Sequence, residues 1–98
     1  MVPFNLQPEL SGRLTTLFAE QLDPLADESG FMRYQVRTFN HRAVVFVNIA
    51  DDPLAPEEVL GYAEDEVFSL EEISTIAKAI REYNRSRQLN FDQMHFDF

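Results

Sequence analysis

The sequence predicts an α+β fold of two layers, in which an N-terminal helix, an antiparallel sheet of about three strands and a C-terminal helix pack together. Apolar residues recur at helical spacing near the start of the chain, two β-rich runs follow, and a helix-capping pattern introduces the last third. The chain has 98 residues, of which 45% are hydrophobic, so we expect residues 1–98 to form a single domain with one core.

The N-terminal helix is expected from Glu9 to about Asp23. Pro8 suits the first turn of a helix, Pro24 would end it, and Gly12 stands in the first turn, where a glycine does least harm. The apolar positions fall on one helix face: Leu10, Leu14, Leu17, Phe18 and Leu22.

Residues 31–49 predict a β-hairpin. Two runs rich in β-branched and aromatic residues flank Asn40-His41, which is typical of a tight two-residue turn. Pairing Phe39 with Arg42 places the expected core side chains on one face, as the two-residue period of a strand requires, and a longer turn would change this pairing. The facing pairs of the buried side are then Thr38 with Ala43, Val36 with Val45, Tyr34 with Val47, and Met32 with Ile49.

The other face of this hairpin carries Arg33 and Arg37 around Val44 and Phe46. A face that mixes charged and apolar side chains is either covered or used in binding. We expect the N-terminal helix to cover it, and the alternative is an interface.

A third strand is expected beside the second run of the hairpin. That run is apolar on both faces over residues 44–47, which indicates a central strand with a neighbour on each side. The candidates are residues 58–62 or a strand that ends near Val67-Phe68. Residues 56–60 also resemble the start of a helix, but we predict a strand.

The C-terminal helix is expected over about residues 70–88. Ser69 and Glu72 form a capping box, and basic residues follow acidic ones in the order that the helix dipole favours. One stripe of the helix is apolar: Ile73, Ile76, Ala77, Ile80 and Tyr83. Residues 90–98 then form an aromatic and acidic tail, which packs on its own domain or docks on a partner or a second copy.

The charge of the chain is polarised. The net charge is −9, and no Lys or Arg occurs over residues 43–77, which we call the acidic segment. This segment holds nine acids, while the eight acids elsewhere match the eight bases. The nine acids are Asp51, Asp52, Glu57, Glu58, Glu64, Asp65, Glu66, Glu71 and Glu72. Such a charge disfavours nonspecific binding to nucleic acid or to anionic lipid.

The residue types give little support to catalysis. The chain has no Cys, which excludes thiolate nucleophiles and Cys-based metal sites and favours a cytoplasmic location. Its two histidines are His41, expected in the hairpin turn, and His95, expected in the tail. No nucleophile, phosphate-binding or EF-hand motif is present. Neighbouring carboxylates diverge on a helix or a strand, so we expect no metal, no cofactor and no enzyme; the pairs are Asp51-Asp52, Glu57-Glu58 and Glu71-Glu72.

We therefore predict a non-enzymatic interaction domain that binds a protein partner with a basic surface, and that binds neither nucleic acid directly nor a membrane. Its size and charge are typical of small acidic inhibitors that phages direct against host defence or transcription, so an inhibitor or nucleic-acid mimic is the sharpest form of this prediction. The alternatives are a homodimeric or accessory subunit, assembled through the hairpin face and the tail, and a small carboxylate-based enzyme. The predicted partner-binding residues are Asp51, Asp52, Glu57, Glu58, Glu64, Asp65, Glu66, Phe96 and Phe98.

Overall fold

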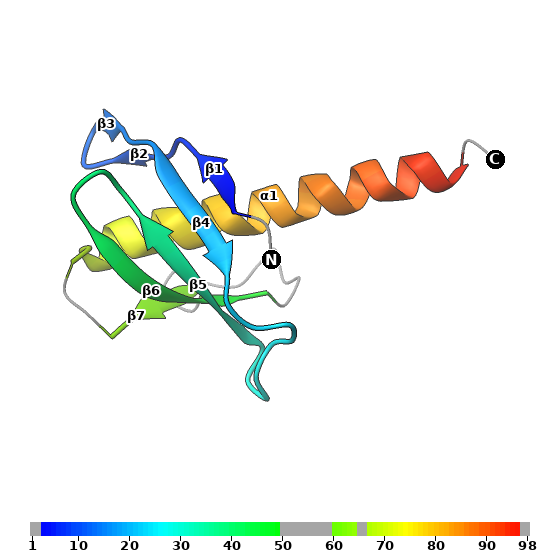
Figure 1. Ribbon diagram of the computed structural model, residues 1–98, viewed down its shortest axis with the longest axis horizontal. Helices are drawn as coiled ribbons and strands as arrows, with labels where there is room; N and C mark the ends of the chain where they lie inside the picture. The colour runs from blue at the N-terminus through cyan, green and yellow to red at the C-terminus, as the bar shows by residue number, and fades with distance from the viewer. Residues whose placement is uncertain (1–2, 50–59, 65–66, 97–98) are drawn as a thin grey trace.

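The computed structural model describes residues 3–49, 60–64 and 67–96, with residues 88–96 described by their backbone. Its strands β1, β4, β5, β6 and β7 form, in this order, one antiparallel sheet, and the helix α1 lies across one face of that sheet (Figure 1). The predicted α+β class is confirmed, but the sheet has five strands instead of about three. The elements are β1 (Phe4–Leu6), β2 (Glu9–Leu10), β3 (Arg13–Leu14), β4 (Leu17–Gln21), β5 (Phe31–Arg37), β6 (Arg42–Asn48), β7 (Gly61–Ala63) and α1 (Leu70–Phe96).

The predicted N-terminal helix is wrong, because residues 9–23 fold into three short strands, β2, β3 and β4. Ser11 and Gly12 have positive φ angles of 52° and 80°, the conformation of a type I′ turn, and they join β2 to β3 as a two-residue hairpin. A Ser-Gly pair is a turn signal, although a glycine in the first turn of a helix does little harm. The turn therefore decides the local structure against the helical spacing of the leucines.

The strand β4 follows from the same correction. Leu17 and Ala19 are fully buried while Phe18 between them is 42% exposed, which is the two-residue period of a strand with one face in the core. The β-branched pair Thr15-Thr16 precedes it and favours extended backbone. Because β4 pairs with both β1 and β5, the N-terminal residues widen the sheet instead of covering it.

The hairpin of β5 and β6 has the predicted faces but not the predicted pairing. Arg37 faces Arg42 and Tyr34 faces Val45, which shifts the register by two residues. The reason is the turn: Thr38 N–H donates to the His41 carbonyl (2.8 Å), and His41 N–H donates to Thr38 Oγ1 (3.0 Å), so the connection spans residues 38–41. A shift of two residues leaves every side chain on its own face.

The strand β6 is central, as predicted, with β5 on one side and β7 on the other. The strand β7 covers residues 61–63 and pairs Phe46 with Tyr62. A strand therefore pairs with β6 in this region, and it overlaps the candidate range 58–62 at residues 61–62. Residues 53–59 and 65–66, where strand and helix were both considered, lie outside the described residues.

The capping box predicted for the helix is confirmed. Ser69 N–H donates to Glu72 Oε1 (2.9 Å), and Glu72 N–H donates to Ser69 Oγ (3.1 Å). The helix runs for 27 residues to Phe96, beyond its predicted end near residue 88, so residues 90–96 of the tail continue the helix. Phe98 lies outside the described residues. No helix among the described residues combines the length and the apolar character needed to cross a bilayer.

The core lies between α1 and the inner face of the sheet. The predicted helix stripe is buried at Ile73, Ile76, Ala77 and Ile80. It meets residues from three strands that are also buried: Leu17, Tyr34, Val36, Val45 and Val47. The Tyr34 hydroxyl accepts a hydrogen bond from Asn84 Nδ2 (3.0 Å), and burial raises the pKa of this tyrosine.

The helix is longer than the sheet that it covers. At about 1.5 Å per residue, its 27 residues span about 40 Å, whereas a strand of seven residues spans about 23 Å. Tyr83 stacks on Phe4 of β1, with ring centroids 4.0 Å apart, and this contact lies near the edge of the sheet. Beyond it, the last turns of α1 project past the strands (Figure 1).

Gly61 allows α1 to approach β7 closely. A Cβ at this position would lie 2.8 Å from Ala77 Cβ on the helix and 2.9 Å from the carbonyl oxygen of Phe46 on the neighbouring strand. Neither atom is the end of a flexible side chain, so the helix or the strand would have to move. The close packing of helix and sheet therefore requires a glycine here.

We expect Gly61→Ala to lower the free energy of unfolding by about 1–3 kcal/mol, as overpacking of a core does, and urea denaturation followed by circular dichroism measures the change. Gly12 is the control, because it has a positive φ of 80° and a Cβ there would meet no atom within 4 Å. Asn tolerates a positive φ angle, so Gly12→Asn should lower the free energy of unfolding less than Gly12→Ala does. At Gly61, Asn should lower it more than Ala does. A Gly61→Ala protein as stable as the wild type would contradict this account.

Candidate functional site

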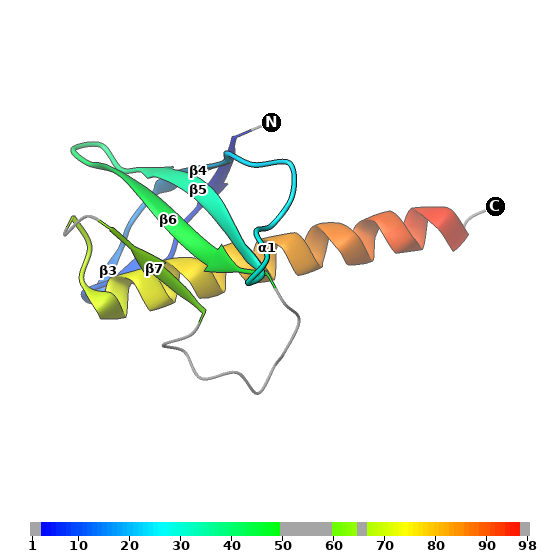
Figure 2. The same cartoon turned by 90° about the horizontal axis from the view of Figure 1, so that it is seen from below.

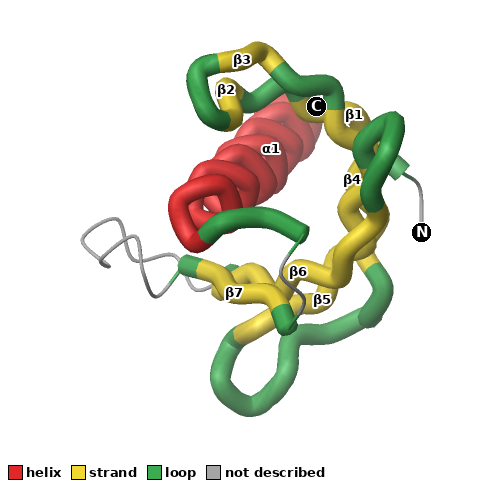
Figure 3. Tube along the Cα trace, turned by 90° about the vertical axis from the view of Figure 1, so that its left-hand side faces the viewer, coloured by secondary structure: helices red, strands yellow, loops and turns green. Residues whose placement is uncertain are grey.

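The sheet has one uncovered face. Among the described residues, no helix or strand packs on the side opposite α1 (Figures 2 and 3). The predicted cover by an N-terminal helix is wrong because those residues join the sheet as strands. We call this surface the open face; its residues are Phe18, Glu20, Phe31, Arg33, Gln35, Arg37, Arg42, Val44, Phe46, Asn48 and Tyr62.

Three rings form an aromatic cluster on the open face. Phe46 and Tyr62 face each other on neighbouring strands and stack with parallel rings, their centroids 4.7 Å apart. Phe31 meets the Tyr62 ring edge-on at 5.2 Å. Tyr62 remains 43% exposed. Aromatic pairs of this kind contribute about 0.5–1.5 kcal/mol beyond the area they bury, so the cluster is a preformed apolar surface that still faces solvent.

A salt bridge fixes the arginine beside this cluster. Arg33 lies opposite Phe46, and its Nε and Nη2 atoms donate to the two carboxylate oxygens of Asp23 at 2.9 and 2.7 Å. These hydrogen bonds hold the pKa of Asp23 below its ordinary value and raise the pKa of Arg33. Asp27 orders the following loop by accepting hydrogen bonds from the N–H groups of Ser29 and Phe31. Arg33 is therefore held in place with its charge balanced.

A second pair of arginines lies at the other end of the hairpin. Gly30 with Ile49 and Thr38 with His41 are hydrogen-bonded pairs, so Arg37 and Arg42 form a pair without mutual hydrogen bonds, where facing side chains come closest. Like charges directly opposite each other destabilise a sheet by roughly 0.2–1 kcal/mol. Among the described residues, neither guanidinium contacts a carboxylate.

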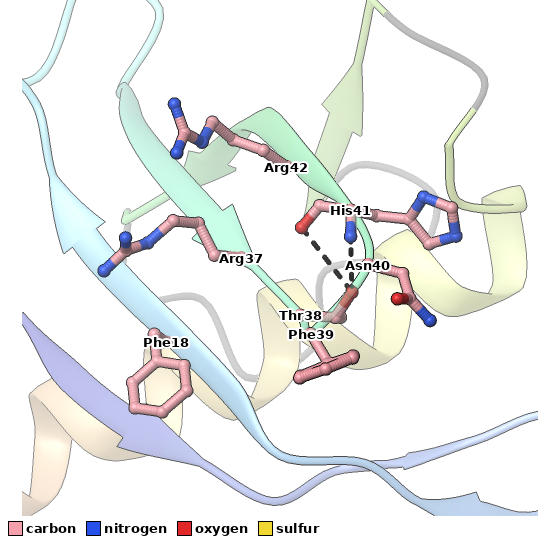
Figure 4. A pocket seen from close by; sticks show the side chains of 7 residues that line it. All are labelled: Phe18, Arg37, Thr38, Phe39, Asn40, His41 and Arg42. Carbon is pink, nitrogen blue, oxygen red and sulfur yellow. Dashed lines mark hydrogen bonds between the residues drawn. The ribbon is translucent and has the colours of Figure 1, made fainter.

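A shallow hollow of about 430 Å³ contains this arginine pair (Figure 4). Phe18 of β4 lies directly opposite Arg37, so Phe18, Arg37 and Arg42 form one row across three strands. Figure 4 shows both arginine side chains on the same side of the hairpin, with the His41 ring on the other side. The hollow therefore presents two positive charges next to a phenyl ring.

A groove of about 550 Å³ continues this surface around the β5–β6 turn, towards the β2–β3 hairpin. Its most exposed apolar side chains are Phe39 at the tip of the turn, which is 100% exposed, and Leu14, which is 73% exposed. Apolar side chains this exposed and this close together often mark an interaction site.

The structure does not bring the predicted partner-binding residues into one described surface. Glu64 follows β7 and is exposed, and Phe96 is the last residue of α1. Glu71 and Glu72 of the acidic segment stand in the first turn of α1, where Glu72 belongs to the capping box. The other predicted residues lie outside the described part of the chain: Asp51, Asp52, Glu57, Glu58, Asp65, Glu66 and Phe98.

The described residues offer surface contacts more readily than reaction chemistry. His41 is exposed in the β5–β6 turn, where the sequence predicts it. No three Asp, Glu or His side chains within the described ranges are grouped so that they could hold a metal ion. The buried residues of these ranges include no polar or charged side chain. What the arrangement can do is bind a surface through rings and guanidinium groups.

Comparison with known proteins found no family model, no curated protein and no solved structure that matches this chain.

The Asp23–Arg33 salt bridge predicts how the stability of the protein depends on pH. A lowered pKa in the folded state means that the pair stabilises the protein above the ordinary pKa of an aspartate, and that this contribution is lost as the pH falls through the lowered pKa. A carboxyl NMR titration should place the Asp23 midpoint below the ordinary value, and Arg33→Gln should move it upwards. Arg13→Gln, an exposed arginine on β3, is the control. The same Asp23 midpoint in wild type and Arg33→Gln would refute the assignment.

Proposed function

We propose that this protein is a non-enzymatic interaction domain that binds a partner protein through the open face of its sheet. The aromatic cluster of Phe31, Phe46 and Tyr62 is the observation that carries the proposal. The solvent face of an antiparallel sheet is normally polar, whereas on this one the Tyr62 ring contacts the rings of both Phe31 and Phe46. The chain contains no cysteine, which favours a cytoplasmic location.

The composition of the open face supports binding to protein. Aromatic residues and arginine are enriched at the residues that contribute most to protein–protein binding. Here Arg33 lies opposite Phe46, and its salt bridge to Asp23 holds it in one conformation before any partner arrives. A preordered surface loses less conformational freedom on binding, so more of the favourable contact energy contributes to the free energy of binding.

The size of the open face indicates that the interface extends beyond it. Five strands about 4.8 Å apart and up to seven residues long present roughly 24 by 23 Å. This is less than the ~800 Å² that each partner contributes to a standard complex. The groove beside Phe39 and Leu14 adjoins the open face at the β5–β6 turn and supplies further apolar area.

A photo-crosslinking experiment tests the proposal. Benzoylphenylalanine at Tyr62 should give a defined protein adduct in cells, because this side chain lies at the centre of the exposed rings. The same group at Ser86, an exposed residue of α1, is the matched control. The yield of this adduct should fall when Phe46→Ser is introduced as well.

Mass spectrometry of the adduct distinguishes a second copy of this chain, the homodimer considered from the sequence, from a different protein. No adduct at Tyr62, or the same adducts at Tyr62 and Ser86, would reject the open face as the binding surface.

The acidic segment is a second candidate surface. It holds all the excess negative charge of the chain, and two of its acids, Glu64 and Glu71, are exposed. It would bind a basic partner, as an inhibitor or nucleic-acid mimic does. The open face instead carries three arginines and one acid, Glu20, so the two candidates favour partners of opposite charge.

Charge reversal separates the two candidates. Glu64→Lys with Glu71→Lys changes the net charge from −9 to −5, two units for each substitution, and so does the control of Glu9→Lys with Glu28→Lys outside the segment. If the open face binds the partner, both double variants should associate with the protein identified by crosslinking at least as fast as the wild type does. Stopped-flow measurements at low and high salt give these rates. A slowing of about tenfold in the Glu64/Glu71 variant alone, fading with salt, would assign binding to the acidic segment.

A further inference from the structure

We infer that Arg37 and Arg42, together with Phe18, form an anion-binding subsite that recognises an acidic segment of the partner protein. This inference rests on the proposed function and adds the chemistry of the partner. The row of Phe18, Arg37 and Arg42 crosses β4, β5 and β6 on the open face and forms part of the wall of the 430 Å³ hollow at the β5–β6 turn (Figure 4).

The two arginines form a like-charge pair. Arg37 and Arg42 face each other where two strands bring side chains closest, and no carboxylate among the described residues contacts either of them. The residues that line the hollow include no acid. Such a pair repels itself in the free protein, and a carboxylate that accepts hydrogen bonds from both guanidinium groups removes the repulsion. The pair is therefore arranged to gain from an anion supplied by another molecule.

The strand β5 carries a further arginine that already binds a carboxylate. Arg33 lies four residues before Arg37 on β5 and on the same face, and it is paired with Asp23 through two hydrogen bonds of 2.9 and 2.7 Å. The open face thus already shows how one of its arginines binds a carboxylate. Arg37 and Arg42 have the same donor groups, are exposed as Arg33 is, and line a hollow at the end of the hairpin.

The side chains around the two arginines indicate the class of partner. Phe18 is 42% exposed beside Arg37, and Phe39 is fully exposed at the tip of the adjoining turn, so apolar rings lie next to the two charges. An extended peptide that alternates acidic and apolar side chains matches this arrangement. A nucleic acid matches it less well, because the protein carries a net charge of −9 and this site would offer two arginines to a continuous row of phosphates.

The experiment uses the full-length protein labelled with ¹⁵N and three probes. The first probe is a blocked hexapeptide that alternates glutamate and phenylalanine, the second replaces glutamate by glutamine, and the third is a thymidine hexanucleotide. The glutamate peptide should shift the side-chain N–H signals of Arg37 and Arg42 and bind about tenfold more tightly than the glutamine peptide, as expected for charge-assisted hydrogen bonds. Arg37→Gln and Arg42→Gln should each weaken it about tenfold, while Arg85→Gln, at an exposed position of α1, should not.

A second readout separates binding from folding. If the arginines serve the ligand, Arg42→Gln should leave the melting temperature of the free protein unchanged or higher, because it removes a like-charge pair. A lower melting temperature would show a structural role and overturn the inference. So would equal binding of the two peptides, no binding up to millimolar concentration, or tighter binding of the hexanucleotide. Crosslinking at Tyr62 reports on the proposed function independently, so an adduct that persists in Arg42→Gln with unchanged affinity refutes this subsite and leaves the proposed function standing.

Discussion

The packing of α1 on the inner face of the sheet determines which surfaces of this molecule meet solvent. The helix buries one apolar stripe, centred on Ile76 and Ile80, against the side chains of β4, β5 and β6 that point inwards. A helix stripe can cover only one face of a sheet. Since the N-terminal residues widen the sheet as strands, α1 is the helix that the described residues provide, and the outer face has no second layer. The aromatic and basic side chains of that face are exposed as a direct result.

The sequence predicted correctly the features that depend on local patterns. The capping box at Ser69 and Glu72 and the helix stripe that follows it agree with each other, so the start of α1 was predictable. The buried face of the hairpin followed from its two-residue period. The N-terminal helix was wrong because Ser11-Gly12 forms a turn that periodicity does not detect, and the register was wrong because the Thr38 side chain takes a place in the turn hydrogen bonds. Both errors arise at turns, where one or two residues override a longer pattern.

Only part of the candidate site could be predicted from the sequence. Arg33, Arg37, Val44 and Phe46 were recognised as one face, with an interface as the alternative to a covered surface. Their neighbours were not, because a row across a sheet joins residues from strands that are far apart in the chain. Tyr62 enters the site only when β7 is placed beside β6. The acidic residues that the sequence emphasised have a simple charge pattern but no pairing rule that would bring them together, and the described structure gives them no common surface.

The core and the open face are connected through β7. Gly61 faces the core and brings Ala77 of α1 against this strand, while Tyr62, the next residue, points outwards and stacks on Phe46. Because successive side chains of a strand point to opposite faces, displacing β7 at Gly61 also displaces the Tyr62 ring. Phe31 meets that ring from β5, so the whole aromatic cluster depends on how closely the helix approaches the strand. A substitution that loosens the core at Gly61 should therefore weaken binding at the open face even where the protein remains folded, and a loss of binding in such a variant reports on the position of β7 as much as on stability.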